Sequence, residues 1–157
     1  MKYSFDTSGF LNPWKHFYSP KLFPRLWNTL DGLIQSGLIV ATQMIIDELE
    51  DYDDEVLKWV RDRRKNLIID VDSDQEALVD MMVNNPELEG FVDTNSTSDQ
   101  ADPYVVALAM KYKLIVVTDE KRPKKGRIKI PDVCRYYDVE CIDFQTFLSQ
   151  IGYTDQK

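Results

Sequence analysis

Short apolar and β-branched runs alternate along the chain with longer stretches in which apolar residues recur every three or four positions. The short runs predict strands at residues 3–5, 38–41, 67–71, 114–117 and 140–142. The fourth run reads Leu-Ile-Val-Val without a polar position, as expected of a central strand that is buried on both faces. Strands that alternate with helices indicate a parallel sheet with helices on both sides.

The longer stretches carry the spacing of amphipathic helices. They predict helices over residues 22–34, 44–60, 74–83, 105–110 and 144–151, with a group of acids interrupting the second. The polar segment 84–102, which contains Asn-Asn-Pro and Thr-Asn-Ser-Thr-Ser, predicts an exposed loop. We therefore expect a three-layer α/β/α sandwich around a central parallel sheet of about five strands.

Composition narrows the class of protein. With 157 residues, of which 43% are apolar, the chain has the size of one domain, and we expect residues 1–157 to form it. Cys134 and Cys141 form no CxxC pair and His16 is the sole histidine, so a zinc site is poorly supported. Without a signal peptide or a long apolar run, the sequence predicts a cytoplasmic protein with reduced thiols and no membrane contact.

The charge is unevenly distributed. A net charge of -8 argues at first against a polyanionic partner. However, six of the nineteen basic residues lie within the nine positions 121–129. Because an acidic protein can still carry a basic face, nucleic acid stays open as a partner.

Acidic residues stand where a parallel sheet binds its ligands. Asp6 directly follows the first predicted strand, and Asp119 and Glu120 follow the fourth after Thr118. Ligands of open parallel sheets bind at the carboxyl ends of the strands. Two central strands thus both end in carboxylates.

Two further acids, Glu48 and Asp102, lie near the beginnings of helices, which in such a fold adjoin the same edge of the sheet. All four positions can therefore converge. Carboxylates brought together repel one another unless a cation neutralises them, and Mg²⁺ or Mn²⁺ suits oxygen ligands.

Each acid also has a structural explanation. Asp6 and Asp102, which precedes Pro103, fit helix N-caps. Glu48 lies within an acidic stretch typical of a solvated helix face, and Asp119 and Glu120 could be turn residues. The joint placement favours a functional site because the separate explanations do not predict it.

Four segments, in this order, resemble the motifs of PIN domains. The opening Tyr-Ser-Phe-Asp-Thr-Ser is similar to their first strand, and Ile-Ile-Asp-Glu-Leu places Glu48 where their second helix opens. Asp102-Pro-Tyr-Val-Val-Ala-Leu-Ala looks like their Asp followed by an Ala-rich helix. Leu-Ile-Val-Val-Thr-Asp-Glu resembles their strand ending in Thr-x-Asp. The segment Ile-Pro-Asp-Val-Cys after a basic stretch is similar to an uncharacterised bacterial branch of PIN-like proteins.

The resemblance implies a metal-dependent endoribonuclease, of the kind found as the VapC-type toxin of bacterial toxin–antitoxin pairs, with an antitoxin partner and often a homodimeric state. It implies that Asp6 and Asp102 are the principal ligands of Mg²⁺ or Mn²⁺. Glu48 and Glu120 would bind a second ion or orient the attacking water. In the motif Thr-x-Asp the acid stands two residues after Thr, a position held here by Glu120, and Asp119 is the substitute.

The basic stretch gives the expected RNA contacts, because phosphate contacts supply most sequence-independent affinity. Its residues in this role are Lys121, Arg122, Lys124, Lys125 and Arg127. The alternative is a solvated loop. A non-catalytic nucleic-acid-binding or protein-binding module of the same fold is the main rival to the nuclease. A haloacid dehalogenase is disfavoured because Ser8 stands where its second Asp belongs.

Overall fold

The structure is a computed structural model that describes residues 1–52, 54–92, 101–120 and 127–155. Its strands are β1 (Tyr3–Phe5), β2 (Ile39–Thr42), β3 (Ile68–Ile69), β4 (Ile115–Val117) and β5 (Cys141–Ile142). Its α-helices are α1 (Thr7–Asn12), α2 (Pro24–Gln35), α3 (Met44–Glu50), α4 (Asp54–Asp62), α5 (Arg64–Leu67), α6 (Ser73–Val83), α7 (Asp102–Tyr112), α8 (Ile130–Tyr136) and α9 (Phe144–Gln150). A π-helix, η1 (Pro13–Phe17), and a 3₁₀-helix, η2 (Pro86–Leu88), complete the elements.

The strands form one parallel sheet in the order β3-β2-β1-β4-β5. β1 lies at its centre, with Tyr3 opposite Ile39 on one side and Ile115 on the other. The chain builds outward from β1 to β2 and β3, then returns to β4 and β5 on the opposite side. The order of strands therefore reverses between β1 and β4, which is where ligands bind in open α/β sheets.

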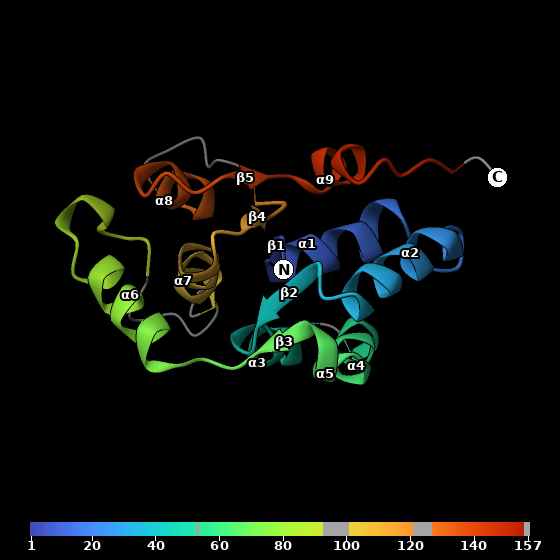
Figure 1. Cartoon of the computed structure of the whole chain (residues 1–157), viewed down its shortest axis with the longest axis horizontal. Coiled ribbons are helices and arrows are strands. Elements are labelled where there is room, and N and C mark those ends of the chain that lie inside the picture. The colour runs from blue at the N-terminus through green and yellow to red at the C-terminus, as the bar shows by residue number, and fades with distance from the viewer. Residues whose placement is uncertain (53, 93–100, 121–126, 156–157) are drawn as a thin grey trace.

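Helices cover both faces of the sheet, as Figure 1 shows, with α7 on one side and α1 and α2 on the other. β1 illustrates why. Tyr3 and Phe5 point to one face, where their rings meet Phe147 of α9 with centroids 4.9 and 5.0 Å apart. Ser4 points to the opposite face and donates to the Val105 carbonyl of α7 at 3.2 Å. The predicted α/β/α sandwich with a five-stranded parallel sheet is confirmed.

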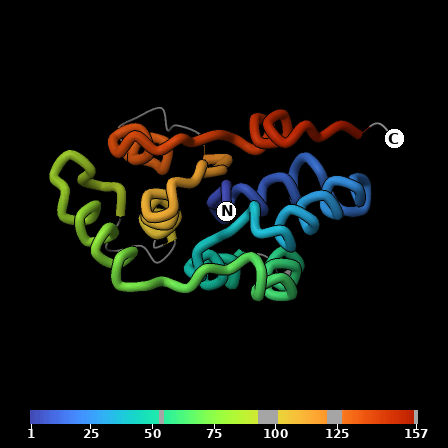
Figure 2. Tube along the Cα trace, in the orientation of Figure 1, coloured from blue at the N-terminus to red at the C-terminus, as the bar shows by residue number. Residues whose placement is uncertain are grey.

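The C-terminal segment returns to the first helices. Figure 2 shows the chain after α9 running on the side of the molecule where α2 lies. Arg25 of α2 donates to the Asp155 carbonyl at 3.3 Å. Within the described ranges, no helix is both long enough and apolar enough to span a membrane.

Several elements differ from the sequence-based prediction. The predicted helix 44–60 is two helices, α3 and α4, separated where the acids interrupt it. The short helices α1, α5 and α8 and the π-helix η1 were not predicted, because each is too short to show a helical period. The predicted exposed loop 84–102 is wrong in its first part, since Leu88 and Phe91 are buried in the core. Residues 93–100 lie outside the described residues.

Candidate functional site

The candidate site lies at the carboxyl ends of β1 and β4, where the strand order reverses. The backbone N–H of Asp6 donates to the Val117 carbonyl at 2.9 Å and joins the two strand ends. Gly9 of α1 lies against the same place, and a Cβ atom there would be 3.0 Å from the Val117 oxygen. A side chain at this position would force α1 away from β4, so glycine allows α1 to begin directly beside the site.

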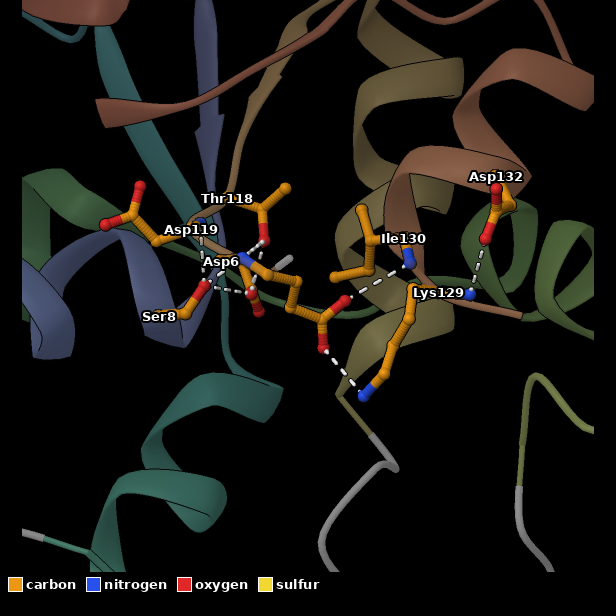
Figure 3. A network of polar contacts seen from close by, with 8 residues as sticks. Asp6, Ser8, Thr118, Asp119, Lys129, Ile130 and Asp132 are labelled. Carbon is orange, nitrogen blue, oxygen red and sulfur yellow. Dashed lines mark hydrogen bonds and ion pairs between the residues drawn. The ribbon is translucent and has the colours of Figure 1, made fainter. Parts of the chain in front are cut away.

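Asp6 is the centre of a buried polar network (Figure 3). Its Oδ2 accepts hydrogen bonds from Ser8 Oγ at 2.8 Å and from Thr118 Oγ1 at 3.0 Å. Ser8 Oγ also accepts from the Asp119 backbone N–H at 2.9 Å, which connects α1 to the end of β4. Two hydroxyls thus fix one carboxylate oxygen of Asp6 and orient its side chain.

The other oxygen of Asp6 has no such support. Oδ1 is buried and has no hydrogen-bond partner among the described residues. Burial raises the pKa of Asp6 above its ordinary value, although the Ser8 and Thr118 hydroxyls work against that rise. Burying a polar oxygen without a partner costs free energy, and a bound ligand or a proton on Oδ1 would offset this cost.

Asp102 is buried at the start of α7 on the other side of the site. Burial is the largest cause that raises its pKa, to about 10, and the charges of Asp6, Glu120 and Glu48 add to it. The pKa of Glu48, in α3, is also raised, to about 8. Burial is again the largest cause, followed by the charges of Asp6 and Glu120. Glu48 Oε2 is also buried without a hydrogen-bond partner in the described part of the chain.

Glu120 faces the same centre from the loop after β4. Its pKa is raised chiefly by burial and then by the charge of Asp6, whereas a hydrogen bond with the Asp102 side chain lowers it. The backbone N–H of Ile130, at the start of α8, donates to Glu120 Oε2 at 3.2 Å. Lys129 Nζ lies 3.8 Å from Glu120 Oε1.

Asp119 points away from this centre, as Figure 3 shows. Its Oδ1 accepts from the backbone N–H of Phe144, at the start of α9, at 3.2 Å. Of the two acids that the sequence left open, Glu120 is therefore the one that shares the site with Asp6 and Asp102.

Helix capping and a solvated helix face, the structural explanations for these acids, do not match the contacts of Asp6, Asp102 and Glu48. Asp6 holds the N-cap position of α1, yet its side chain makes no capping hydrogen bond. Asp102 is the first residue of α7 and does not cap it either, because the N-cap is Ala101. Glu48 is not part of a solvated face, since one of its carboxylate oxygens is buried. Asp72 and Asp143 do cap their helices, α6 and α9.

Lys129 was not singled out from the sequence, where it is only the last member of the basic stretch. Its ammonium group lies beside Glu120 and opposes the rise in the pKa of Asp102. The backbone N–H of Lys129 donates to Asp132 Oδ2 at 3.1 Å, which fixes the residue at the start of α8. The sequence does contain one signal for its position: Pro131 predicts that a helix starts here, which places Lys129 at the start of that helix.

The four acids share an electrostatic neighbourhood without a preformed coordination shell. Among residues 1–52, 54–92, 101–120 and 127–155, no three Asp, Glu, His or Cys side chains are placed to hold one metal ion as they stand. The donor set nevertheless fits a hard divalent cation, because it consists of carboxylate oxygens. The unpartnered Asp6 Oδ1 and Glu48 Oε2 are the oxygens with coordination capacity to spare.

The expected RNA-binding stretch is only partly covered. Lys121, Arg122, Lys124 and Lys125 lie outside the described residues. Arg127 is exposed just before α8.

Comparisons with known proteins agree with this architecture. A chain in the crystal structure of VapBC2 from Rickettsia felis, bound to a DNA fragment from their promoter, matches with a TM-score of 0.58. The match covers 91% of this chain and 98% of that one at 15% sequence identity, so the likeness is one of fold. It confirms the PIN-like fold that the motifs indicated.

At the sequence level, no curated protein matches the chain significantly. The model of one family, described as "Domain of unknown function (DUF4411)", matches residues 3–154. This match spans nearly the whole chain, including all the acids of the site. The chain therefore belongs to the DUF4411 family and has a PIN-like fold.

Proposed function

We propose that this protein is a metal-dependent endoribonuclease, with Asp6, Glu48, Asp102 and Glu120 at its active centre. The observation that carries the proposal is the mutual electrostatic influence of these acids where the strand order reverses. Natural proteins seldom bury like charges without a functional reason, and perturbed pKa values of this kind cluster at functional sites.

In this proposal Asp6 and Asp102 are the principal ligands of Mg²⁺ or Mn²⁺, and Glu48 and Glu120 bind a second ion or orient the attacking water. The cation, when bound, lowers the pKa of water and offsets negative charge on the phosphodiester. Ser8 and Thr118 hold Asp6 Oδ2, which leaves the unpartnered Oδ1 available to a cation. Glu48 and Glu120 have long side chains that can rotate toward a cation, which accounts for the lack of a preformed shell among the described residues.

The chain also offers cations for the substrate. Lys129 lies at the edge of the acidic centre and is well placed to contact an oxygen of the scissile phosphate. Lys121, Arg122, Lys124, Lys125 and Arg127 would bind the RNA backbone nearby. Replacing Lys124, Lys125 and Arg127 by Ala should flatten the salt dependence of RNA binding, by a slope of about 0.7 for each phosphate that the variant no longer neutralises.

The cellular role that we propose is the toxin of a toxin–antitoxin pair, acting in the cytoplasm as a monomer or homodimer. The support is the fold shared with a chain of the VapBC2 crystal structure. Expression of the wild-type chain should then arrest growth, whereas Asp102→Asn should not, and a protein encoded next to the gene should relieve the arrest.

A non-catalytic module that binds nucleic acid or protein is the second candidate. It is favoured by the lack of three metal-binding side chains in a common position within the described ranges. Incubating the purified chain with mixed single-stranded RNA and Mg²⁺ or Mn²⁺ separates the two. Cleavage that stops on addition of EDTA supports the nuclease. Cleavage of DNA but not RNA would keep the nuclease proposal and change its substrate. Cleavage of neither nucleic acid would favour the non-catalytic module.

A further inference from the structure

A pocket of about 450 Å³ opens beside the acidic centre. The residues after β4, from Thr118 to Glu120, form one part of its lining. The end of α1 and the π-helix η1 contribute Asn12 and the run His16 to Tyr18. The start of α9 contributes Asp143 to Gln145. Because Thr118 and Glu120 line the pocket and also belong to the acidic centre, the pocket adjoins that centre.

The aromatic wall of this pocket is fixed by an uncommon piece of backbone. The N–H of Tyr18 donates to the Pro13 carbonyl at 2.7 Å, five residues back, in the π-helical pattern. Trp27 Nε1 holds the Tyr18 carbonyl at 2.6 Å. The Tyr18 ring packs edge-on against Phe23, with centroids 5.3 Å apart, and lies 5.9 Å from the ring of Phe144. π-helical turns occur often at functional sites.

Phe17 has a different environment from Tyr18. The residue is 61% exposed, although it stands between His16 and Tyr18 in the pocket wall. The Phe17 ring touches both neighbours, with centroids 6.3 and 6.5 Å apart. Packing in the core does not explain an aromatic ring in this position. A flat ligand that enters the pocket would cover it.

We propose that this pocket binds an unpaired nucleobase of the RNA strand, next to the phosphodiester that lies at the acidic centre. The inference rests on the proposed nuclease function and adds that the substrate is single-stranded at this position. Bases of single-stranded nucleic acids stack on aromatic side chains, and a pocket of this volume is in the range that binds small ligands. The amides of Asn12 and Gln145 can hydrogen-bond the edge of the base.

The charge of the pocket favours a base over a phosphate. The acidic residues Asp119, Glu120 and Asp143 belong to its lining, and among the described residues His16 is the sole basic residue there. Such a lining repels phosphate oxygens. It suits the exocyclic amino groups of adenine, cytosine and guanine, which donate hydrogen bonds to carboxylates.

The test uses the full chain and a short single-stranded RNA that carries 2-aminopurine, whose fluorescence falls when it stacks. Binding is measured in EDTA, where the proposed cleavage cannot occur, and KM and kcat are measured on the same RNA with Mg²⁺. Phe17→Ala removes the stacking ring, and Phe17→Trp restores one. Tyr136→Ala is the matched control, because Tyr136 is a 48% exposed aromatic residue outside the pocket lining.

We expect Phe17→Ala to weaken RNA binding by about 5- to 10-fold, the lower end of the range for one base–aromatic stack. The 2-aminopurine should brighten, and KM should rise while kcat stays nearly constant. Phe17→Trp should restore affinity and quenching, and Tyr136→Ala should match the wild type. Wild-type affinity, quenching and KM in Phe17→Ala, in a chain that cleaves RNA, would overturn the pocket assignment and leave the nuclease intact. A wild-type chain that neither binds nor cleaves RNA would overturn both.

Discussion

Two groups of carboxylates in this protein have opposite environments. At the junction of α6 and α7, Lys111 pairs with Asp72 and lies 3.1 Å from Asp74. The hydrogen bond from Lys111 lowers the pKa of Asp72 and the same contact raises the pKa of Lys111. At the ends of β1 and β4, burial raises the pKa of Asp6, and burial together with the charges of neighbouring acids raises the pKa values of Asp102, Glu48 and Glu120.

The difference separates acids that stabilise the fold from acids that reduce its stability. Asp72 accepts from the Gln75 backbone N–H at 2.9 Å, caps α6 and has a cation beside it. Asp102 has no capping role and stands among other acids. Lys129 brings a cation to the edge of that group, beside Glu120. Such an arrangement lowers the stability of the folded protein, and proteins usually retain such a loss only at functional sites.

The largest effect should separate Asp102→Asn from its matched control Asp72→Asn. We expect Asp102→Asn to reduce RNA cleavage by at least about 100-fold, because it removes a charged ligand from the proposed metal site. Asp72→Asn removes a charge of the same size far from that site and should cleave at the wild-type rate. Initial rates on one RNA substrate at fixed Mg²⁺ provide the measurement. Equal rates for the two variants would contradict the division of roles.

A second effect concerns stability against pH. A carboxyl whose pKa is raised in the folded state binds its proton more tightly there than in the unfolded chain. Stability therefore falls as pH rises from the unfolded pKa to the folded one, a window of 3.8 to about 10 for Asp102 and 4.5 to about 8 for Glu48.

Melting temperatures of the metal-free protein should consequently fall between pH 5 and pH 9. Asp102→Asn should flatten this decline and melt at an equal or higher temperature than the wild type at pH 8. Mn²⁺ should raise the wild-type melting temperature more at pH 8 than at pH 5, because the cation competes with protons for the carboxylates. A melting temperature that rises steadily from pH 5 to pH 9 would show that the pKa values of these acids are not raised in the folded protein.

The smallest effect is expected at the paired cluster. Lys111→Met removes the cation and keeps the aliphatic stem, so the ion pairs with Asp72 and Asp74 and the contact of the ammonium group with the Tyr112 ring disappear. Ion pairs that are partly exposed to solvent contribute little, and we expect the melting temperature to fall by no more than about 3 °C. Cleavage should be unchanged. A loss of cleavage in this variant would mean that the α6–α7 junction also serves the active site.

The sheet could be predicted from the sequence because its strands are short, apolar and well separated. The predicted strand 3–5 is β1 as observed, and the predicted run 114–117 contains β4. Strand ends then placed Asp6 and Glu120 at one edge of the sheet. The positions of Glu48 and Asp102 near helix starts then added these two acids, and the order of the motifs supported all four.

The surroundings of the site could not be predicted in this way. The π-helix that carries His16 and Phe17 spans five residues, too few to show a period. Lys129 looked like part of a basic stretch, and its contact with Glu120 depends on how α8 folds back toward the sheet. Such contacts between distant segments follow from tertiary packing, which local spacing does not record.

The most direct test of the central claim is calorimetric titration of Mn²⁺ into the metal-free protein at pH 7.5, in two buffers of different ionisation enthalpy. The pair of buffers counts the protons released as the cation binds. We predict saturable binding with release of about one proton or more per ion, since Asp102 and Glu48 hold protons at this pH and a cation displaces them. Asp102→Asn should bind more weakly and release fewer protons. Absence of binding, or binding that releases no protons and is unaltered by Asp102→Asn, would contradict the account.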